Sequence, residues 1–324
     1  MNDLFYGTPL ETVAPYIWLA LGLVALVLCG NWLVTGSVRL ARYFRVSTFI
    51  VGLTIVAYGT SAPEMFISIG AAVGGYHDIA LGNVIGSNIA NIGAILAIVA
   101  IVATIPIRNK ALGFDLAILF AVTLLLFVFG LNGVIGRLEG IALVALLATY
   151  TAWSVVKSRK ASLETDDPAA PTKVNPLAAA ALVLAALVGL YFGADWFVGG
   201  AREIALQWGV SERVIAISVV AVGTSMPELV ASLVAAFKKE ADLSIGNIIG
   251  SNLFNIAGVL GVTSIVRPLA VGDRSLFVSD MIWLFGISAA LLLVMLPLSR
   301  GKITRWKGSL LLLIFATYMV VLFR

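Results

Sequence analysis

Residues 59–64 of the chain read Gly-Thr-Ser-Ala-Pro-Glu, and residues 223–228 read Gly-Thr-Ser-Met-Pro-Glu, an offset of 164 residues (224 − 60). The same offset maps a second polar motif, Gly-Asn-Val-Ile-Gly-Ser-Asn at residues 82–88, onto Gly-Asn-Ile-Ile-Gly-Ser-Asn at residues 246–252. Two polar motifs at one constant offset, in a chain that is otherwise apolar, predict an internal duplication.

The sequence around these motifs is strongly apolar. Hydrophobic residues make up 60% of the 324 residues and charged residues only 12%, whereas soluble domains carry about 25% charged residues. We therefore predict an all-α polytopic membrane protein. A helix needs about 20 apolar residues to cross the hydrocarbon core. On this basis we predict ten transmembrane helices, at residues 16–38, 47–73, 79–103, 112–131, 138–157, 177–201, 212–237, 243–266, 276–297 and 304–323.

The basic residues test this count independently. With ten spans both chain ends lie on the same side of the membrane. If that side is the outside, it holds no lysine and only six of the 21 basic residues. Because cytoplasmic loops carry an excess of Lys and Arg, we predict an integral plasma (inner) membrane protein with both termini outside. The six outside residues are Arg137, Arg202, Arg213, Arg267, Arg274 and Arg324.

The longest polar stretch, residues 158–175, divides the chain into two halves and is predicted to be a cytoplasmic linker. Residues 1–157 and 176–324 then hold five spans each. Because five is odd, the second half enters the membrane from the opposite side. The fold predicted is thus two inverted five-helix repeats, an architecture of secondary transporters that bind substrate near the midplane.

Two acidic residues, Glu64 and Glu228, lie inside predicted spans at equivalent positions of the two repeats. A charge at the bilayer centre costs roughly 3 kcal/mol on insertion scales, and such residues face a protein interior or a wet cavity. Calcium takes about six to eight oxygen ligands, carboxylates and carbonyls among them. The pair therefore predicts a two-carboxylate cation site.

Proline precedes each of these carboxylates. Pro63 has no N–H for the carbonyl of Gly59, and its ring crowds that turn, so the helix is predicted to break there. The same argument predicts a break at Pro227. Carbonyls freed at such breaks are suitable cation ligands.

The second motif offers side-chain oxygens at helical spacing. Asn83, Ser87 and Asn91 step by four residues and share one helix face, where they could complete a coordination shell. The alternative is that Ser and Asn only cross-link helices, an interpretation favoured for Asn83 and Asn247. The glycine pairs 82/86 and 246/250 have the spacing of close helix packing, and we expect packing to be their whole role.

Several function classes have little support. The one cysteine, Cys29, cannot form an intrachain disulfide and lacks the neighbours of a zinc site. Neither a nucleotide-binding motif nor a nucleophile–base pair is evident, so we expect no enzyme and no cofactor. The net charge of +4 resides in short loops between spans, which indicates membrane orientation and no nucleic-acid partner. The expected surroundings are membrane lipid, around a monomer.

At these motifs the sequence resembles the calcium/cation antiporter superfamily, in particular the prokaryotic sodium/calcium exchangers. The resemblance implies an antiporter that exchanges Ca²⁺ for Na⁺ by alternating access, in which the first helix of each half slides. It also implies that Glu64 and Glu228 bind both substrates, assisted by hydroxyl, amide or carbonyl oxygens of a wider set. This set is Ala57, Thr60, Ser61, Ser87, Asn91, Ala221, Thr224, Ser225, Ser251 and Asn255.

One position departs from the family pattern. Some members carry Asp where this chain has Asn255, so here the charged core is only the two glutamates. Two other functions stay open at this stage. A proton-coupled cation exchanger would use the same glutamates as proton carriers, whereas a cation channel would need a pore or selectivity filter.

Overall fold

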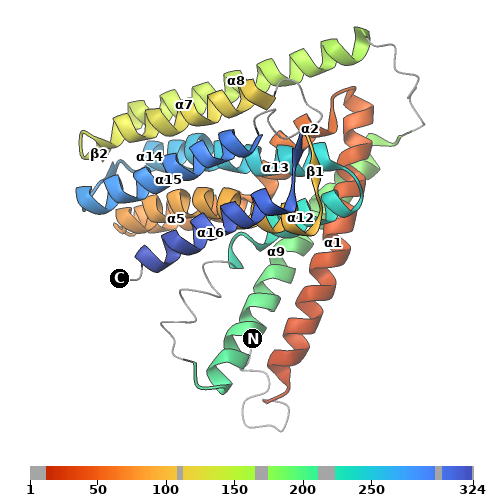
Figure 1. Ribbon diagram of the computed structural model, residues 1–324, viewed down its shortest axis with the longest axis horizontal. Coiled ribbons are helices and arrows are strands. Elements are labelled where there is room, and N and C mark those ends of the chain that lie inside the picture. Colours follow the sequence, from red (N-terminus) through yellow and green to blue (C-terminus); the bar gives the residue numbers. More distant parts are fainter. Residues whose placement is uncertain (1–11, 108–111, 165–173, 211–222, 296–300, 323–324) are drawn as a thin grey trace.

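The computed structural model describes residues 12–107, 112–164, 174–210, 223–295 and 301–322, and these residues are almost entirely helical (Figure 1). The first half comprises α1 (Ala14–Phe44), α2 (Thr48–Val51), η2 (Gly52–Val56), α3 (Ala57–Thr60), α4 (Ala62–Val73), α5 (His77–Ala90), η3 (Asn91–Leu96), α6 (Ala97–Val102), β1 (Ile105–Pro106), α7 (Leu112–Gly130), β2 (Val134–Ile135) and α8 (Arg137–Glu164).

The second half follows the same order where it is described. It comprises α9 (Pro176–Gln207), α12 (Met226–Phe237), α13 (Ala241–Leu253), η5 (Phe254–Leu260), α14 (Gly261–Val266), β3 (Leu269–Ala270), α15 (Arg274–Met295), β4 (Lys302–Ile303) and α16 (Arg305–Leu322). The η elements are short π-helical stretches, which often mark functional sites. Two of them, η3 and η5, occupy equivalent positions of the two halves.

Within the described residues, eight helices are long and apolar enough to cross a membrane, and a bent pair, 48–60 with 62–73, gives a ninth. Nine of the ten predicted spans thus correspond to described helices. The remaining one, 212–237, is described only from residue 223, where α12 forms its second part. Three helices end later than predicted. Helix α1 continues to Phe44 and α9 to Gln207, each six residues beyond its predicted span, and α8 continues to Glu164, seven residues into the predicted linker.

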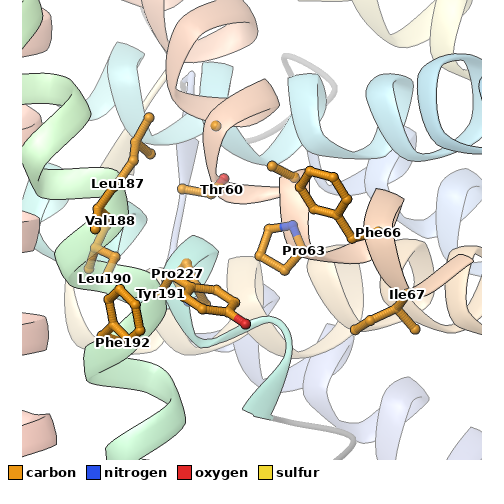
Figure 2. A pocket seen from close by; sticks show the side chains of 12 residues that line it. Thr60, Pro63, Phe66, Ile67, Leu187, Val188, Leu190, Tyr191, Phe192 and Pro227 are labelled. Carbon is orange, nitrogen blue, oxygen red and sulfur yellow. The ribbon is translucent and has the colours of Figure 1, made fainter. Parts of the chain in front are cut away.

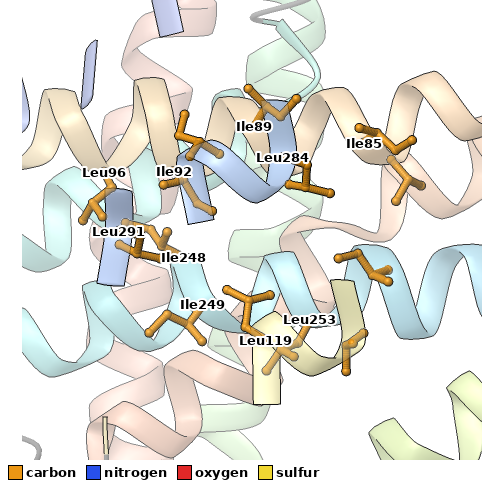
Figure 3. Close-up of a cluster of buried hydrophobic side chains, with 14 of the residues drawn as sticks. Ile85, Ile89, Ile92, Leu96, Leu119, Ile248, Ile249, Leu253, Leu284 and Leu291 are labelled. Carbon is orange, nitrogen blue, oxygen red and sulfur yellow. The ribbon is translucent and has the colours of Figure 1, made fainter. Parts of the chain in front are cut away.

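Two continuous helical rods form the centre of the molecule. One consists of α5, η3 and α6, and the other of α13, η5 and α14. Their apolar side chains interdigitate with those of α7 and α15 in one large cluster (Figure 3). Every residue of α13 except Asp242 is buried. A helix that is buried on nearly all sides belongs in such a core, so the second copy of the Gly-Asn motif, residues 246–252, is fixed in a closely packed part of the fold.

The two longest helices, α1 and α9, lie side by side and run across the direction of α5, α7 and α15 (Figure 1). Small residues let their backbones approach closely: a side chain on Gly193 would meet backbone atoms of Gly22 and Leu26. Such contacts are the usual basis of helix association in membranes. The pair therefore forms one unit beside the core.

Two short antiparallel strand pairs join the halves. β1 pairs with β4, matching Ile105 with Ile303, and β2 pairs with β3, matching Ile135 with Leu269. Each pair takes one strand from each half, so the loops of the two halves are tied together at two places. The strands are only two residues long and do not change the all-α class.

Candidate functional site

Both glutamates of the repeated motif are buried in the protein interior. Glu64 lies in the first turn of α4 and Glu228 in the first turn of α12, each directly after its proline. Each side chain is only 1% exposed, and the two carboxylates interact electrostatically. Two buried like charges are costly unless a counter-charge compensates them, which makes this the strongest candidate for a cation site in the described structure.

The predicted helix break is confirmed in the first copy. The helix bends by 44° between Thr60 and Ala62, and Ser61, at the bend, has left the helical conformation. The carbonyl of Ala57 still accepts the backbone N–H of Ser61 at 3.0 Å and the Thr60 hydroxyl at 3.3 Å. A cation bound by this carbonyl would therefore compete with the Thr60 hydroxyl.

The two copies of the motif contact each other. Ser61 donates a hydrogen bond of 2.9 Å to Oε1 of Glu228, across 167 residues of sequence. The hydroxyl of Thr60 lies 3.5 Å from Oδ1 of Asn247. The glutamate of one copy is thus held by the serine of the other, and the candidate site belongs to both halves.

Within each copy, an asparagine of the second motif ties the two helices together. Asn83 donates to Ser68 at 3.0 Å and to the carbonyl of Glu64. Asn247 donates to Ser232 at 2.9 Å and to the carbonyl of Glu228. These matched bonds support the interpretation that both asparagines cross-link helices. Each asparagine fixes the helical turn that carries a glutamate.

Four further residues of the predicted ligand set lie in the π-helical stretches η3 and η5 or one helical turn before them. Asn91 begins η3 and Asn255 lies in η5. The glutamate-bearing helix of each half contacts the π-helical stretch of the other half, α4 against η5 and α12 against η3. Ser87 and Ser251 precede these asparagines by four residues and are buried.

Several oxygens in this region are buried without a hydrogen-bond partner among the described residues. They are Oε2 of Glu64 and of Glu228, Oδ1 of Asn91 and of Asn255, and Oγ of Ser251. Unsatisfied buried acceptors are rare in native proteins and call for an explanation such as a bound ion. Oxygen-only donors suit hard cations such as Na⁺ and Ca²⁺ and do not suit soft metals.

The last three residues of the predicted ligand set are Ala221, Thr224 and Ser225, in the sequence just before Glu228. Ser225 is 5% exposed at the start of α12, and Thr224 beside it is partly buried. Ala221 lies outside the described residues. No group of three or more His, Cys, Asp or Glu side chains that could hold a metal occurs in the described part of the chain. Glu64 and Glu228 are the two charged members of the predicted ligand set.

The close packing predicted for the two glycine pairs is confirmed in the second copy of the motif. A side chain on Gly246 or Gly250 would collide with the backbone carbonyl of Phe49 or Leu53, so this pair packs closely as expected. A side chain on Gly82 or Gly86 would meet no described atom within 4 Å. The positions that match Phe49 and Leu53 are 213 and 217, and both lie outside the described residues. The packing prediction for Gly82 and Gly86 is therefore not tested and stays a prediction.

A cavity of about 560 Å³ lies between the first motif and the middle of α9 (Figure 2). Thr60, Pro63 and Pro227 line its inner end, so it reaches the proline breaks of both copies. The rest of the wall is formed by Gly59, Ala62, Phe66, Ile67, Leu187, Val188, Leu190, Tyr191 and Phe192. The cavity thus lies beside the contact between α3 and α9 and offers a route along that helix to the candidate site.

Sequence reasoning missed two polar contacts that α8 makes with other helices. Asp115 of α7 is buried and accepts a hydrogen bond of 2.6 Å from Tyr150 of α8; an acid inside a predicted span was the signal for it. The hydroxyl of Tyr58, on α3, shares a hydrogen bond of 2.6 Å with Thr151. No sequence pattern marked Tyr58, since its partner lies 93 residues away.

Comparison with known proteins agrees with this architecture. A family model described as "Sodium/calcium exchanger protein" matches residues 14–156 and 178–324. The chain belongs to this family. It is therefore a transport protein, as the resemblance of its two motifs implied, and cation antiport is the activity of its class.

Individual relatives match almost the whole chain. The putative antiporter CaxA of Alkalimonas amylolytica is 36% identical, covering 95% of this chain and 98% of its own length. The sodium/calcium exchanger MaX1 of Methanosarcina acetivorans is 31% identical, covering 95% and 98%. Among solved structures, the sodium-calcium exchanger NCX_Mj soaked with 10 mM Na⁺ and zero Ca²⁺ superimposes with a TM-score of 0.81 at 33% identity, covering 95% and 99%.

Proposed function

We propose that this chain exchanges Ca²⁺ for Na⁺ across the membrane by alternating access. The observation that carries the proposal is the buried pair Glu64 and Glu228, surrounded by oxygen donors from both copies of the motif. Membership of the sodium/calcium exchanger family supports the same assignment.

The proposed ligands combine charge with neutral oxygens. Glu64 and Glu228 bind whichever substrate is present, and the unpartnered oxygens of Asn91, Asn255 and Ser251 complete the shell. The other proposed contributors are Ala57, Thr60, Ser61, Ser87, Ala221, Thr224 and Ser225. Oxygen ligands of this kind suit Ca²⁺, and backbone carbonyls at broken helices also coordinate Na⁺.

Charge balance explains why transport is coupled. One Ca²⁺ or two Na⁺ neutralise two carboxylates, so the substrates compete for overlapping positions. An empty site would leave two uncompensated charges in a low-dielectric core, which is strongly unfavourable. The protein therefore changes between outward and inward access when the site holds a cation, and rarely when the site is empty. This favours exchange over leak.

For the topology we propose ten spans in two inverted repeats, in the plasma membrane, with both termini outside. The excess of basic residues on the opposite side supports the orientation. The cross-half strand pairs and the matched asparagine bonds support a two-fold relation between the halves. Nothing in the proposed mechanism needs a second copy of the chain, so a monomer suffices.

Alternating access is proposed to arise from joint movement of α1 and α9. These helices pack closely on each other along small residues and lie beside the core. The cavity against α9 lies on the route by which an ion would reach Thr60 and the glutamates. In the proposed orientation, Phe66 and Phe192 lie on the outer side of the breaks, so this cavity corresponds to access from outside.

The decisive experiment is ⁴⁵Ca²⁺ uptake into proteoliposomes loaded with Na⁺, at matched pH inside and outside, with K⁺-loaded vesicles as the control. We expect uptake only with internal Na⁺. Uptake that requires a pH gradient would replace this proposal with proton-coupled exchange. Equal uptake in both vesicle types, at rates far above those of exchangers, would indicate a channel.

A further inference from the structure

The short helix α3, which carries Ala57 and Thr60, is weakly restrained by its own backbone. The π-helical η2 precedes it and the 44° bend follows it. Both features interrupt the regular i→i−4 hydrogen-bond ladder. The position of its ligand atoms therefore depends on side-chain contacts with neighbouring elements.

Tyr58 supplies two such contacts from the middle of α3. Its hydroxyl shares a hydrogen bond of 2.6 Å with Thr151 of α8. Its ring stacks on Phe254, with centroids 4.5 Å apart and planes inclined by 22°. Phe254 begins η5 and directly precedes Asn255, so one side chain connects α3 to α8 and to the ligand-bearing stretch of the other half.

The next residue faces the helix pair that we propose to move. A side chain on Gly59 would collide with Leu187 of α9. Helix α3 is therefore held by Tyr58 on the core side and touched by α9 on the other. Because Tyr58 anchors α3 to the core, the ligand atoms of α3 stay in place while α9 moves.

The anchor occurs in one copy of the repeat only. At the offset of 164 residues, Val222 replaces Tyr58 and Ala90 replaces Phe254. Valine has no hydroxyl to bond and no ring to stack. The duplicated motif thus carries an aromatic anchor on one side of the pseudo-symmetric site and none on the other.

We infer that Tyr58 is a positioning residue for cation binding, which fixes the oxygens of α3 against α8 and η5. This inference rests on the proposed function, since it takes Ca²⁺ as a substrate of the site. Tyr58 itself touches no ion in this account. Its hydroxyl and its ring act through Thr151 and Phe254.

The test measures Ca²⁺-dependent stabilisation of the purified full-length protein in detergent, because a ligand stabilises the folded state according to its affinity. For Tyr58→Phe, which keeps the ring and loses the hydroxyl, we expect the Ca²⁺ concentration for half-maximal stabilisation to rise about 2- to 10-fold. Thr151→Val removes the other end of the same bond. The double variant is expected to match either single variant, since both delete one interaction.

The matched control is Tyr318→Phe, a buried tyrosine on α16 outside the site, which should leave the Ca²⁺ dependence unchanged. Tyr58→Leu, which also removes the stacked ring, should raise the required Ca²⁺ by a further factor of about 2 to 10. A lower melting temperature with unchanged Ca²⁺ dependence would overturn the inference, as would effects of Tyr58→Phe and Thr151→Val that multiply. Failure of Ca²⁺ to stabilise the wild type would instead overturn the proposed function.

Discussion

The two copies of the repeated motif share one sequence pattern but differ in their surroundings. The asparagine cross-links are nearly identical, with Asn83 to Ser68 at 3.0 Å and Asn247 to Ser232 at 2.9 Å. The serines before the prolines differ: Ser61 donates to Glu228, whereas Ser225 makes no matching bond to Glu64 among the described residues. The repeated motif thus gives both copies the same framework, whereas the same serine makes different contacts in the two copies.

The largest expected effect comes from the feature that the two copies share. Glu64→Gln and Glu228→Gln each remove one of two buried charges, and we expect each to lower Ca²⁺ uptake by about 100-fold or more. Both variants should remain folded, because glutamine keeps the shape of the side chain. ⁴⁵Ca²⁺ uptake in proteoliposomes measures this, and normal flux in both variants would refute the site assignment.

A smaller effect on transport is expected when Ser61 or Ser225 is replaced, and the effect should differ between the two serines. Ser61→Ala removes a hydrogen bond to the carboxylate of Glu228. Bonds to charged groups contribute about 1.5–3 kcal/mol, so the KM for Ca²⁺ should rise about 10- to 100-fold. Ser225→Ala is the matched control and should have a smaller effect. Equal changes in KM would show that the two sides of the site work alike despite their different contacts.

The smallest effect concerns packing and not transport. Gly246→Ala places a methyl group against the backbone of Phe49, and overpacking of this kind costs about 1–3 kcal/mol of folding stability. Gly82→Ala, at the equivalent position, should cost less because no described atom lies near its Cβ. Thermal unfolding in detergent compares the two variants. Equal losses of folding stability in the two variants would show that the two halves do not differ in packing at these positions.

Much of the fold could be read from the sequence because the bilayer imposes simple rules. Apolar length predicted nine helices that the described residues contain, and the motif offset predicted which positions are equivalent. Boundaries were less certain, since polar ends such as residues 158–164 of α8 continue a helix without any apolar signal. The bend at Ser61 was predictable because proline removes a backbone donor and crowds the preceding turn.

What the sequence determined by itself is the chemistry of the site: two carboxylates inside apolar spans, flanked by prolines and by oxygen-bearing side chains at a constant offset. A buried charge is costly enough to be conspicuous in any single sequence. Only the tertiary structure decided which groups meet, such as Ser61 with Glu228 and Tyr58 with Phe254. These pairs are separated by more than 160 residues of chain, and no local periodicity encodes a contact that depends on how two halves pack together.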